Sequence, residues 1–204
     1  MNNLSWVRSI FALSLLVSGA SAPATTAMYT FDSFTFLQTT PLLNCSPEVG
    51  PPGFLASFAS SPNPAAFSIG TVAPNPSFSG QNLMDTSHPG SSDTLTITVN
   101  SAITTVHFDF ALFSPGHLEL HSLAGMASAS TGLTQAGNLS FQSNTGFTQF
   151  SLTGFDTSDL PTMLAIDNLS LTIATVPEPS AGWLLLAGLG LCWIRKQCSS
   201  PGFA

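Results

Sequence analysis

The chain has 204 residues, of which 6% are charged, and its formal net charge at pH 7 is −7. Its only Lys and Arg residues are Arg8, Arg195 and Lys196, so residues 28–175 carry every acid except Glu178 and no cationic side chain besides His. Such a stretch repels nucleic acid and anionic lipid, which excludes nucleic-acid binding as its role. Abundant Phe, Leu and Ile at low charge predict one folded β domain and not a disordered chain.

The N-terminus has the three parts of a secretory signal peptide. Arg8 supplies the positive charge, Ile10–Val17 is an apolar core, and Ala20-Ser21-Ala22 is a small-x-small cleavage site. Pro23 makes cleavage directly before it awkward, so cuts after residue 24 or 27 are equal alternatives. We therefore assign residues 1–27 to a signal peptide that is cleaved between positions 22 and 27.

The first half of the body predicts strands separated by long turns. Met28–Leu37 is rich in aromatic residues and Thr, which predicts a strand. Pro41–Pro76 is rich in Pro and Gly and is predicted to be mostly loop, with short strands at Phe54–Phe58 and Phe67–Val72. Thr94–Val99 alternates strictly, which predicts a strand with its aliphatic side chains inward and its threonines outward.

The next two segments predict a hairpin. Thr104–Phe113 and His117–Ala124 flank Ser114-Pro115-Gly116, which is a tight-turn sequence. Pairing Phe113 with His117 would sort apolar from polar residues on both strands, which is how register is normally set. The resulting pairs are Leu112 with Leu118, Phe110 with Leu120, Asp109 with His121, and Ala111 with Glu119.

The last predicted strand, Met163–Ile173, contains a break in its alternation. Leu164 and Ile166 share one parity while Leu169, Leu171 and Ile173 share the other, so we predict a β-bulge near Asp167-Asn168. Together with a strand at Phe147–Leu152, the pattern indicates short strands joined by Gly and Pro turns. This predicts an all-β fold, a jelly-roll-like β-sandwich, over residues 28–175.

The C-terminal region has three parts in a fixed order. Val176-Pro177-Glu178-Pro179-Ser180 is a short extended peptide, because proline disfavours helix just before it. Ala181–Ile194 is an uncharged run of 14 residues, and Arg195-Lys196 is a basic pair. We interpret the run as a short transmembrane helix, the basic pair as its cytoplasmic stop, and residues 197–204 as a cytoplasmic tail.

This order resembles the PEP-CTERM sorting signal over residues 176–196. The resemblance implies an exported protein of a bacterium that makes extracellular polysaccharide, anchored in the inner membrane as a precursor. It implies processing near the motif by exosortase, a membrane protease-transpeptidase, and a mature form at the cell surface or in the extracellular matrix. The chain departs from the family pattern in its basic cluster of only two residues and in its longer tail. The order of strand blocks also resembles β-sandwich ectodomains that are common among such proteins.

Two groups of residues are candidate metal sites. Carbohydrate-binding β-sandwiches often hold a structural Ca²⁺ between their first and last strands, and Asp32 and Asp167 are the corresponding positions here. The alternative is that each Asp bonds its own backbone. His117, Glu119 and His121 share one strand face, with Asp109 predicted opposite and His107 nearby. Because residues i to i+4 of a strand span roughly 13 Å, one ion would not reach both His, and a solvent face with an Asp109–His121 pair is the alternative.

The function that we predict is that of a non-enzymatic exported surface or extracellular-matrix protein, associated with exopolysaccharide and biofilm. Its partners would be an exosortase-type membrane protease and extracellular polysaccharide, with no cofactor. The first alternative is a carbohydrate-binding module with structural calcium, although the body has one Tyr and no Trp to form a sugar platform. The second is a metal-dependent enzyme that uses His107, Asp109, His117, Glu119 and His121 in a concave pocket.

Overall fold

The computed structural model describes residues 24–71, 78, 80–87, 91, 93–132 and 135–174. The predicted signal peptide before residue 24, the sorting motif Val176–Ser180, the apolar run and the basic pair Arg195-Lys196 lie outside these residues. Among the residues that are described, no helix is long and apolar enough to cross a membrane.

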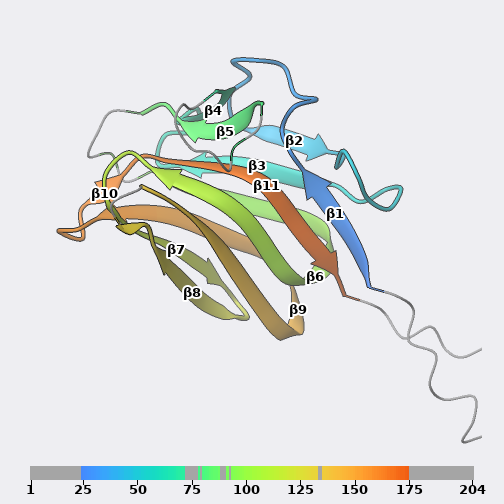
Figure 1. Cartoon of the computed structure of the whole chain (residues 1–204). Coiled ribbons are helices and arrows are strands. Elements are labelled where there is room, and N and C mark those ends of the chain that lie inside the picture. Colours follow the sequence, from blue (N-terminus) through green and yellow to red (C-terminus); the bar gives the residue numbers. More distant parts are fainter. Residues whose placement is uncertain are drawn as a thin grey trace, which may run out of the picture. The chain divides into compact units, whose positions relative to one another are not determined.

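All secondary-structure elements that the structure defines are β-strands, so the all-β prediction is confirmed (Figure 1). They are β1 (Thr25–Tyr29), β2 (Leu42–Cys45), β3 (Ala56–Ser61), β4 (Phe67–Gly70), β5 (Asn82–Asp85), β6 (Thr94–Leu112), β7 (Gly116–Ser122), β8 (Gly125–Ser130), β9 (Ala136–Asp156), β10 (Pro161–Thr162) and β11 (Leu164–Ile173).

The sheet is bent into two layers that share the long strands β6 and β9 (Figure 1). Their pairing is interrupted between Thr98 and Thr105 of β6, where the register shifts. The first part of β6 pairs with β3 and with the end of β9, whereas its second part pairs with β11 and with the start of β9. Strands that pass from one layer to the other through such irregularities form the corners of sandwich folds.

The first layer has the strand order β2-β3-β6-β9-β7-β8, and the second has β4-β5-β11-β6-β9. Strand β11 pairs with β6 along one edge and with both β1 and β5 along its other edge. The short strand β10 pairs with β9. The layers pack face to face: the ring of Tyr29 on β1 lies 5.7 Å from that of Phe58 on β3 and contacts it edge-on. The core therefore lies between the two layers.

The alternation of Thr94–Val99 is confirmed in the first part of β6. Leu95 and Ile97 are 0% exposed and Val99 is 4% exposed, while Thr96 is partly buried and Thr98 is exposed. This segment faces the core on one side and solvent on the other, so apolar and polar residues alternate along it with a period of two.

The first predicted strand, Met28–Leu37, is mostly wrong, because only Met28 and Tyr29 lie in β1, which begins at Thr25. Strand β1 ends at Tyr29, because Phe31 and Leu37 have left-handed backbones with φ of 63° and 64°. Glu48 redirects the chain by accepting hydrogen bonds from the backbone N of Thr30 at 3.2 Å and from Oγ of Ser33 at 2.8 Å. Phe31 is still 0% exposed, so the aromatic side chain is buried by a turn and not by a strand.

The predicted hairpin between β6 and β7 is wrong. Strand β7 pairs with β8 and β9, and β6 pairs with β3, β9 and β11. The turn at 114–116 carries the chain from the second part of β6, in the second layer, to β7 in the first layer, so these two segments lie in different layers and not side by side. The inward-facing side chains are nevertheless those expected, and all are at most 2% exposed: Phe108, Phe110, Leu112, Leu118 and Leu120.

The predicted bulge in the last strand is confirmed. The register of β11 against β6 shifts between Asp167 and Ser170, and Asn168 has a left-handed φ of 53°. The extra residue brings both apolar sets to the core, since Leu164, Ile166, Leu169 and Leu171 are all 0% exposed.

Candidate functional site

The outer face of the first layer is lined with hydroxyl groups. The threonines of β6 stand beside polar residues of β9, with Thr96 paired to Ser151 and Thr98 to Gln149. The hydroxyls of Thr94 and Thr153 are hydrogen-bonded at 3.0 Å. An uncharged face of this kind exchanges hydrogen bonds with water or with another polar surface.

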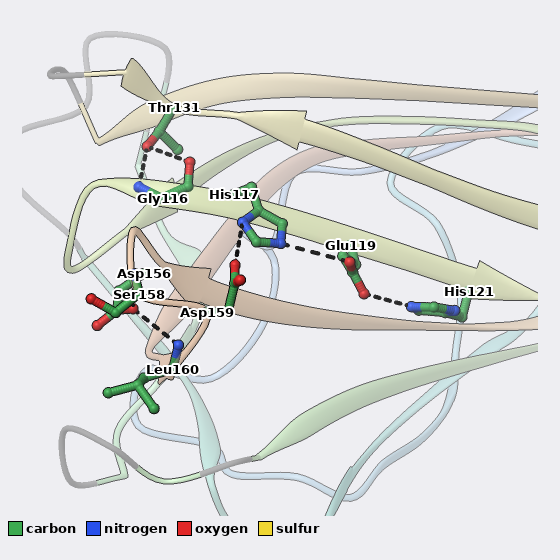
Figure 2. A network of polar contacts seen from close by, with 9 residues as sticks. All are labelled: Gly116, His117, Glu119, His121, Thr131, Asp156, Ser158, Asp159 and Leu160. Carbon is green, nitrogen blue, oxygen red and sulfur yellow. Dashed lines mark hydrogen bonds and ion pairs between the residues drawn. The ribbon is translucent and has the colours of Figure 1, made fainter.

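A chain of ionisable side chains crosses the same face on β7 (Figure 2). Glu119 lies between two imidazoles: its Oε2 is 2.8 Å from Nε2 of His121, and its Oε1 is 3.6 Å from Nε2 of His117. The other ring nitrogen of His117 is 4.0 Å from Oδ1 of Asp159, which is 87% exposed. The ring of His117 also stacks on Phe155, with centroids 5.2 Å apart.

This row of side chains on β7 does not form a metal centre. Glu119 separates the two imidazoles, as the spacing of alternate strand residues requires. In the described part of the molecule, no three His, Cys, Asp or Glu residues are arranged to hold a metal ion. The arrangement is that of a partly exposed salt bridge whose strength depends on the protonation of His.

The residues of the proposed enzymatic face are divided between the layers. Asp109 pairs with Asp167 and Asn138 in the second layer, where its Oδ2 accepts a hydrogen bond from Nδ2 of Asn168 at 2.9 Å. His107 pairs with Ser170 and Ser140 in the same layer. The expected Asp109–His121 pair therefore does not form, because the hairpin that would have created it does not exist.

The predicted calcium ligands have separate structural roles. Oδ1 of Asp32 accepts a hydrogen bond from the backbone N of Gln81 at 2.8 Å, which joins the turn after β1 to the start of β5. A Cβ on Gly80 would lie 2.0 Å from that same oxygen, so this position requires glycine. Asp167 is 0% exposed, and its Oδ1 accepts a hydrogen bond from the backbone N of Asn168 at 2.7 Å. Asp167 thus bonds its own backbone, the alternative that the sequence left open.

Two buried acids have no counterpart among the residues predicted from the sequence. Asp85 and Asp93 are 2% and 6% exposed. Burial raises the pKa of Asp85, hydrogen bonds from Ser87 partly offset this, and the negative charge of Asp93 raises it further. Oδ1 of Asp93 accepts a hydrogen bond from the backbone N of Asn63 at 3.0 Å. The only sequence signal was the Asp85-Thr-Ser87 spacing, which is typical of a side chain that caps its own turn.

Exposed aromatic side chains do not form a platform in the described part of the chain. Tyr29 is 0% exposed and donates a hydrogen bond to the carbonyl of Cys45 at 3.0 Å. Among the described residues, the large aromatic side chains that are well exposed are Phe36, at 54%, and Phe113, at 40%. Phe36 follows β1 and Phe113 follows β6, so they belong to different connections.

Residues 175–196 match the PEP-CTERM protein-sorting motif. The chain therefore carries a PEP-CTERM sorting motif directly after its described β-strand body, and the resemblance noted in the sequence is confirmed. The match begins directly after Ala174, the last described residue. No curated protein matches the chain.

Solved structures with some likeness include a mutant of the family 29 carbohydrate binding module CBM29-2, with 12% identity, a TM-score of 0.40, and coverage of 74% of this chain and 93% of that one. A second CBM29-2 mutant, complexed with mannohexaose, has 10% identity, a TM-score of 0.40 and the same coverage of both chains. The K2 cleaved adhesin domain of Lys-gingipain has 13% identity, a TM-score of 0.42, and coverage of 72% of this chain and 99% of that one. At these TM-scores the likenesses do not bear on function.

Proposed function

We propose that this protein is a non-enzymatic surface or extracellular-matrix protein that is exported and then cut by an exosortase-type membrane protease. The observation that carries the proposal is the sorting motif at residues 175–196, which starts two residues after the end of β11 at Ile173. The precursor is held in the inner membrane by the apolar run Ala181–Ile194, with the basic pair on the cytoplasmic side. Processing releases the β body to the cell surface or the matrix.

The contacts of the ionisable side chains support a structural role for the body. Asp32 joins two segments of backbone, Glu119 bridges two histidines, and Asp109 is bonded to Asn168. A catalytic acid or base needs a position beside a bound substrate and a pKa matched to its task. These side chains are instead engaged in holding turns and strands together.

Association with extracellular polysaccharide is the second part of the proposal. The outer face of the first layer presents hydroxyl and amide groups of β6 and β9, which hydrogen-bond with sugar hydroxyls as they do with water. The alternative function as a carbohydrate-binding module rests on this same face. It lacks support from an aromatic platform, since Tyr29 is buried.

The test of sorting is the intact mass of protein released from cells that have exosortase and from cells that lack it. We expect the released form to end near Pro177–Ser180 and to lack Arg195 and Lys196. Replacing Pro177, Glu178 and Pro179 together with Ala should keep the chain in the membrane fraction, whereas the matched tail substitution Gln197→Ala should not. Released protein that still contains Arg195-Lys196 would contradict the proposal.

A further inference from the structure

One side of the first layer ends in the hairpin of β7 and β8 (Figure 1). Strand β8 is the last in the order β2-β3-β6-β9-β7-β8, and among the described strands it pairs with β7 alone. The second layer ends at β9 on this side, so β7 and β8 extend the first layer beyond it. The outer edge of β8 is therefore an open strand edge.

The backbone groups of every second residue of β8 point to this edge. The backbone N of Thr131 donates to the carbonyl of Gly116 at 2.9 Å, which makes these two a hydrogen-bonded pair of the ladder. Such pairs alternate along an antiparallel ladder, and the register with β7 is unbroken over all six residues of β8. The N–H and C=O groups of Met126, Ser128 and Ser130 thus point away from β7, and among the described residues they have no partner. All three residues are exposed.

The edge of β8 also lacks the usual protection. Proteins protect open edges with Lys, Pro, bulges, very short strands or a covering segment. Strand β4 is covered here by residues 37–40, which hydrogen-bond to its backbone, and β1 is covered at Met28 by Glu48 and Val49. Strand β2 has four residues and a shifted register. Strand β8 has no charged residue, no Pro and no bulge, so its edge is able to accept another strand.

Charge indicates which strand fits this edge. Residues 28–175 carry every acid except Glu178 and no Lys or Arg, so two copies of the body repel each other wherever their acids meet. Residues 123–130, which form β8 and the turn before it, have no ionisable side chain. A strand that pairs here without repulsion is itself neutral, and β8 of a second copy meets this condition. Contacts between identical surfaces about a two-fold axis are the commonest form of self-association.

We propose that β8 pairs antiparallel with β8 of a second copy, about a two-fold axis at Ser128. Ser128 then lies opposite Ser128 of the second copy, and Met126 lies opposite Ser130. Each of these is a hydrogen-bonded pair that exchanges two backbone bonds. A shift by two residues would leave one outward residue without a partner. The register is therefore the one that uses the whole edge.

The acid nearest to this contact does not oppose it. Glu119 of β7 is opposite Ser128, so in the dimer it is three strand spacings, about 14 Å, from Glu119 of the second copy. This exceeds the screening length of about 8 Å at physiological ionic strength. The proposal goes beyond the proposed function and does not depend on processing, because it concerns the folded body of the full chain.

Sedimentation equilibrium of the full chain, in density-matched detergent, tests the pairing. We expect a reversible dimer. Ser128→Pro removes an outward N–H, and Pro is tolerated in a strand where its N faces away from the ladder. It should raise the Kd of the dimer roughly tenfold or more, because each copy loses a donor. Ser128→Ala is the matched control, since it keeps the N–H, and should dimerise like the wild type. A wild-type chain that is monomeric at every concentration, or an equal Kd in Ser128→Pro, would overturn the proposal.

Cysteine cross-linking tests the register and serves if Ser128→Pro does not fold. The chain's own three cysteines are first replaced by Ser. Ser128→Cys should then form a disulfide-linked dimer on oxidation, because Cα atoms of a hydrogen-bonded pair are about 5.5 Å apart, within disulfide range. Met126→Cys and Ser130→Cys should cross-link when the two chains are mixed, but not when each is alone. Ser151→Cys, partly exposed on β9, is the control and should stay monomeric. Equal cross-linking at positions 128 and 151 would refute the β8 contact.

Discussion

At the scale of single residues, Gly116 has a role that its surroundings explain. It begins β7, and a Cβ at this position would lie 1.9 Å from the carbonyl oxygen of Phe155 and 2.7 Å from Cα of Asp156. Its backbone N–H donates to Oγ1 of Thr131 at 3.1 Å, which fixes the strand at this point (Figure 2). The close approach is to backbone atoms of β9, which cannot rotate away as a side chain could.

We therefore expect Gly116→Ala to lower the free energy of unfolding by about 3 kcal/mol or more, at the upper end of the usual cost of overpacking. Urea denaturation measures this. Gly53→Ala is the control: Gly53 has a φ of 79°, but no atom lies within 4 Å of the place that a Cβ would occupy, so only the left-handed penalty of about 1–2 kcal/mol applies. Equal losses in the two variants would argue against the close approach at Gly116.

Asp85 gives the molecule a pH dependence of unusual sign. Burial raises the pKa of its carboxyl above the ordinary value, so the folded state binds more protons than the unfolded state between the two pKa values. Stability therefore falls as pH rises from the unfolded pKa through the raised folded pKa. Asp85→Asn should raise the melting temperature at pH 7, because the amide oxygen can still accept from Ser87, and should leave it nearly unchanged at pH 3. A lower melting temperature of the variant at pH 7 but not at pH 3 would show that the charged form is the one the fold favours.

At the scale of strands, the bulge at Asp167-Asn168 determines which side chains of β11 reach the core. Deleting Asn168 would turn Leu169 and Leu171 to the outer face, and each contributes about 1.5–3 kcal/mol by its burial. We expect the deletion variant to lose its cooperative unfolding transition, as measured by circular dichroism. Asn168→Gly is the control, since glycine keeps the left-handed φ of 53° and removes only the side chain. A cooperative transition in the deletion variant would mean that β11 can re-register.

Strand alternation made some of these features predictable from the sequence, and its limits explain the errors. The parity of Leu95, Ile97 and Val99 identifies the buried face of β6, and the change of parity after Ile166 locates the bulge. Parity cannot distinguish a strand that lies beside another from one that faces it across the core. Both arrangements bury Phe110 and Leu120, so the hairpin was wrong while its core residues were right.

The candidate sites depend on contacts that the sequence does not encode locally. Oδ1 of Asp32 accepts a hydrogen bond from the backbone N of Gln81, far along the chain, and nothing in the sequence around Asp32 indicates this contact. Glu48 accepts hydrogen bonds from Thr30 and Ser33, which come 18 and 15 residues earlier in the chain, and these bonds turn the backbone after Tyr29. Met28–Leu37 therefore has the composition of a strand, but most of it does not form one. The sorting motif is different, because it is a contiguous signal that can be identified without any fold.

At the scale of the whole molecule, the place of β1 limits where the signal peptide is removed. All five residues of β1 pair with β11, from Thr25 with Ile173 to Tyr29 with Leu169, and Ala27 is 0% exposed. A cut after Ala27 would remove three of these pairs, those of Thr25, Thr26 and Ala27. We expect N-terminal sequencing of the exported protein to begin at Pro23 or Thr25, and a form engineered to begin at Met28 to melt at a lower temperature. A natural N-terminus at Met28 would contradict this.

The pairing of Thr25 with Ile173 also has a mechanical consequence. Pulling residues 24 and 174 apart would open the β1–β11 ladder one hydrogen bond at a time, at low force. A pull on residue 174 against the rest of the body instead loads β11 along its length, where it is bonded to β6 on one side and to β1 and β5 on the other. Many bonds then resist together, and single-molecule force measurements in the two geometries would show the difference. The body should thus resist a larger force when it is pulled from residue 174 against the other strands than when its two ends are pulled apart.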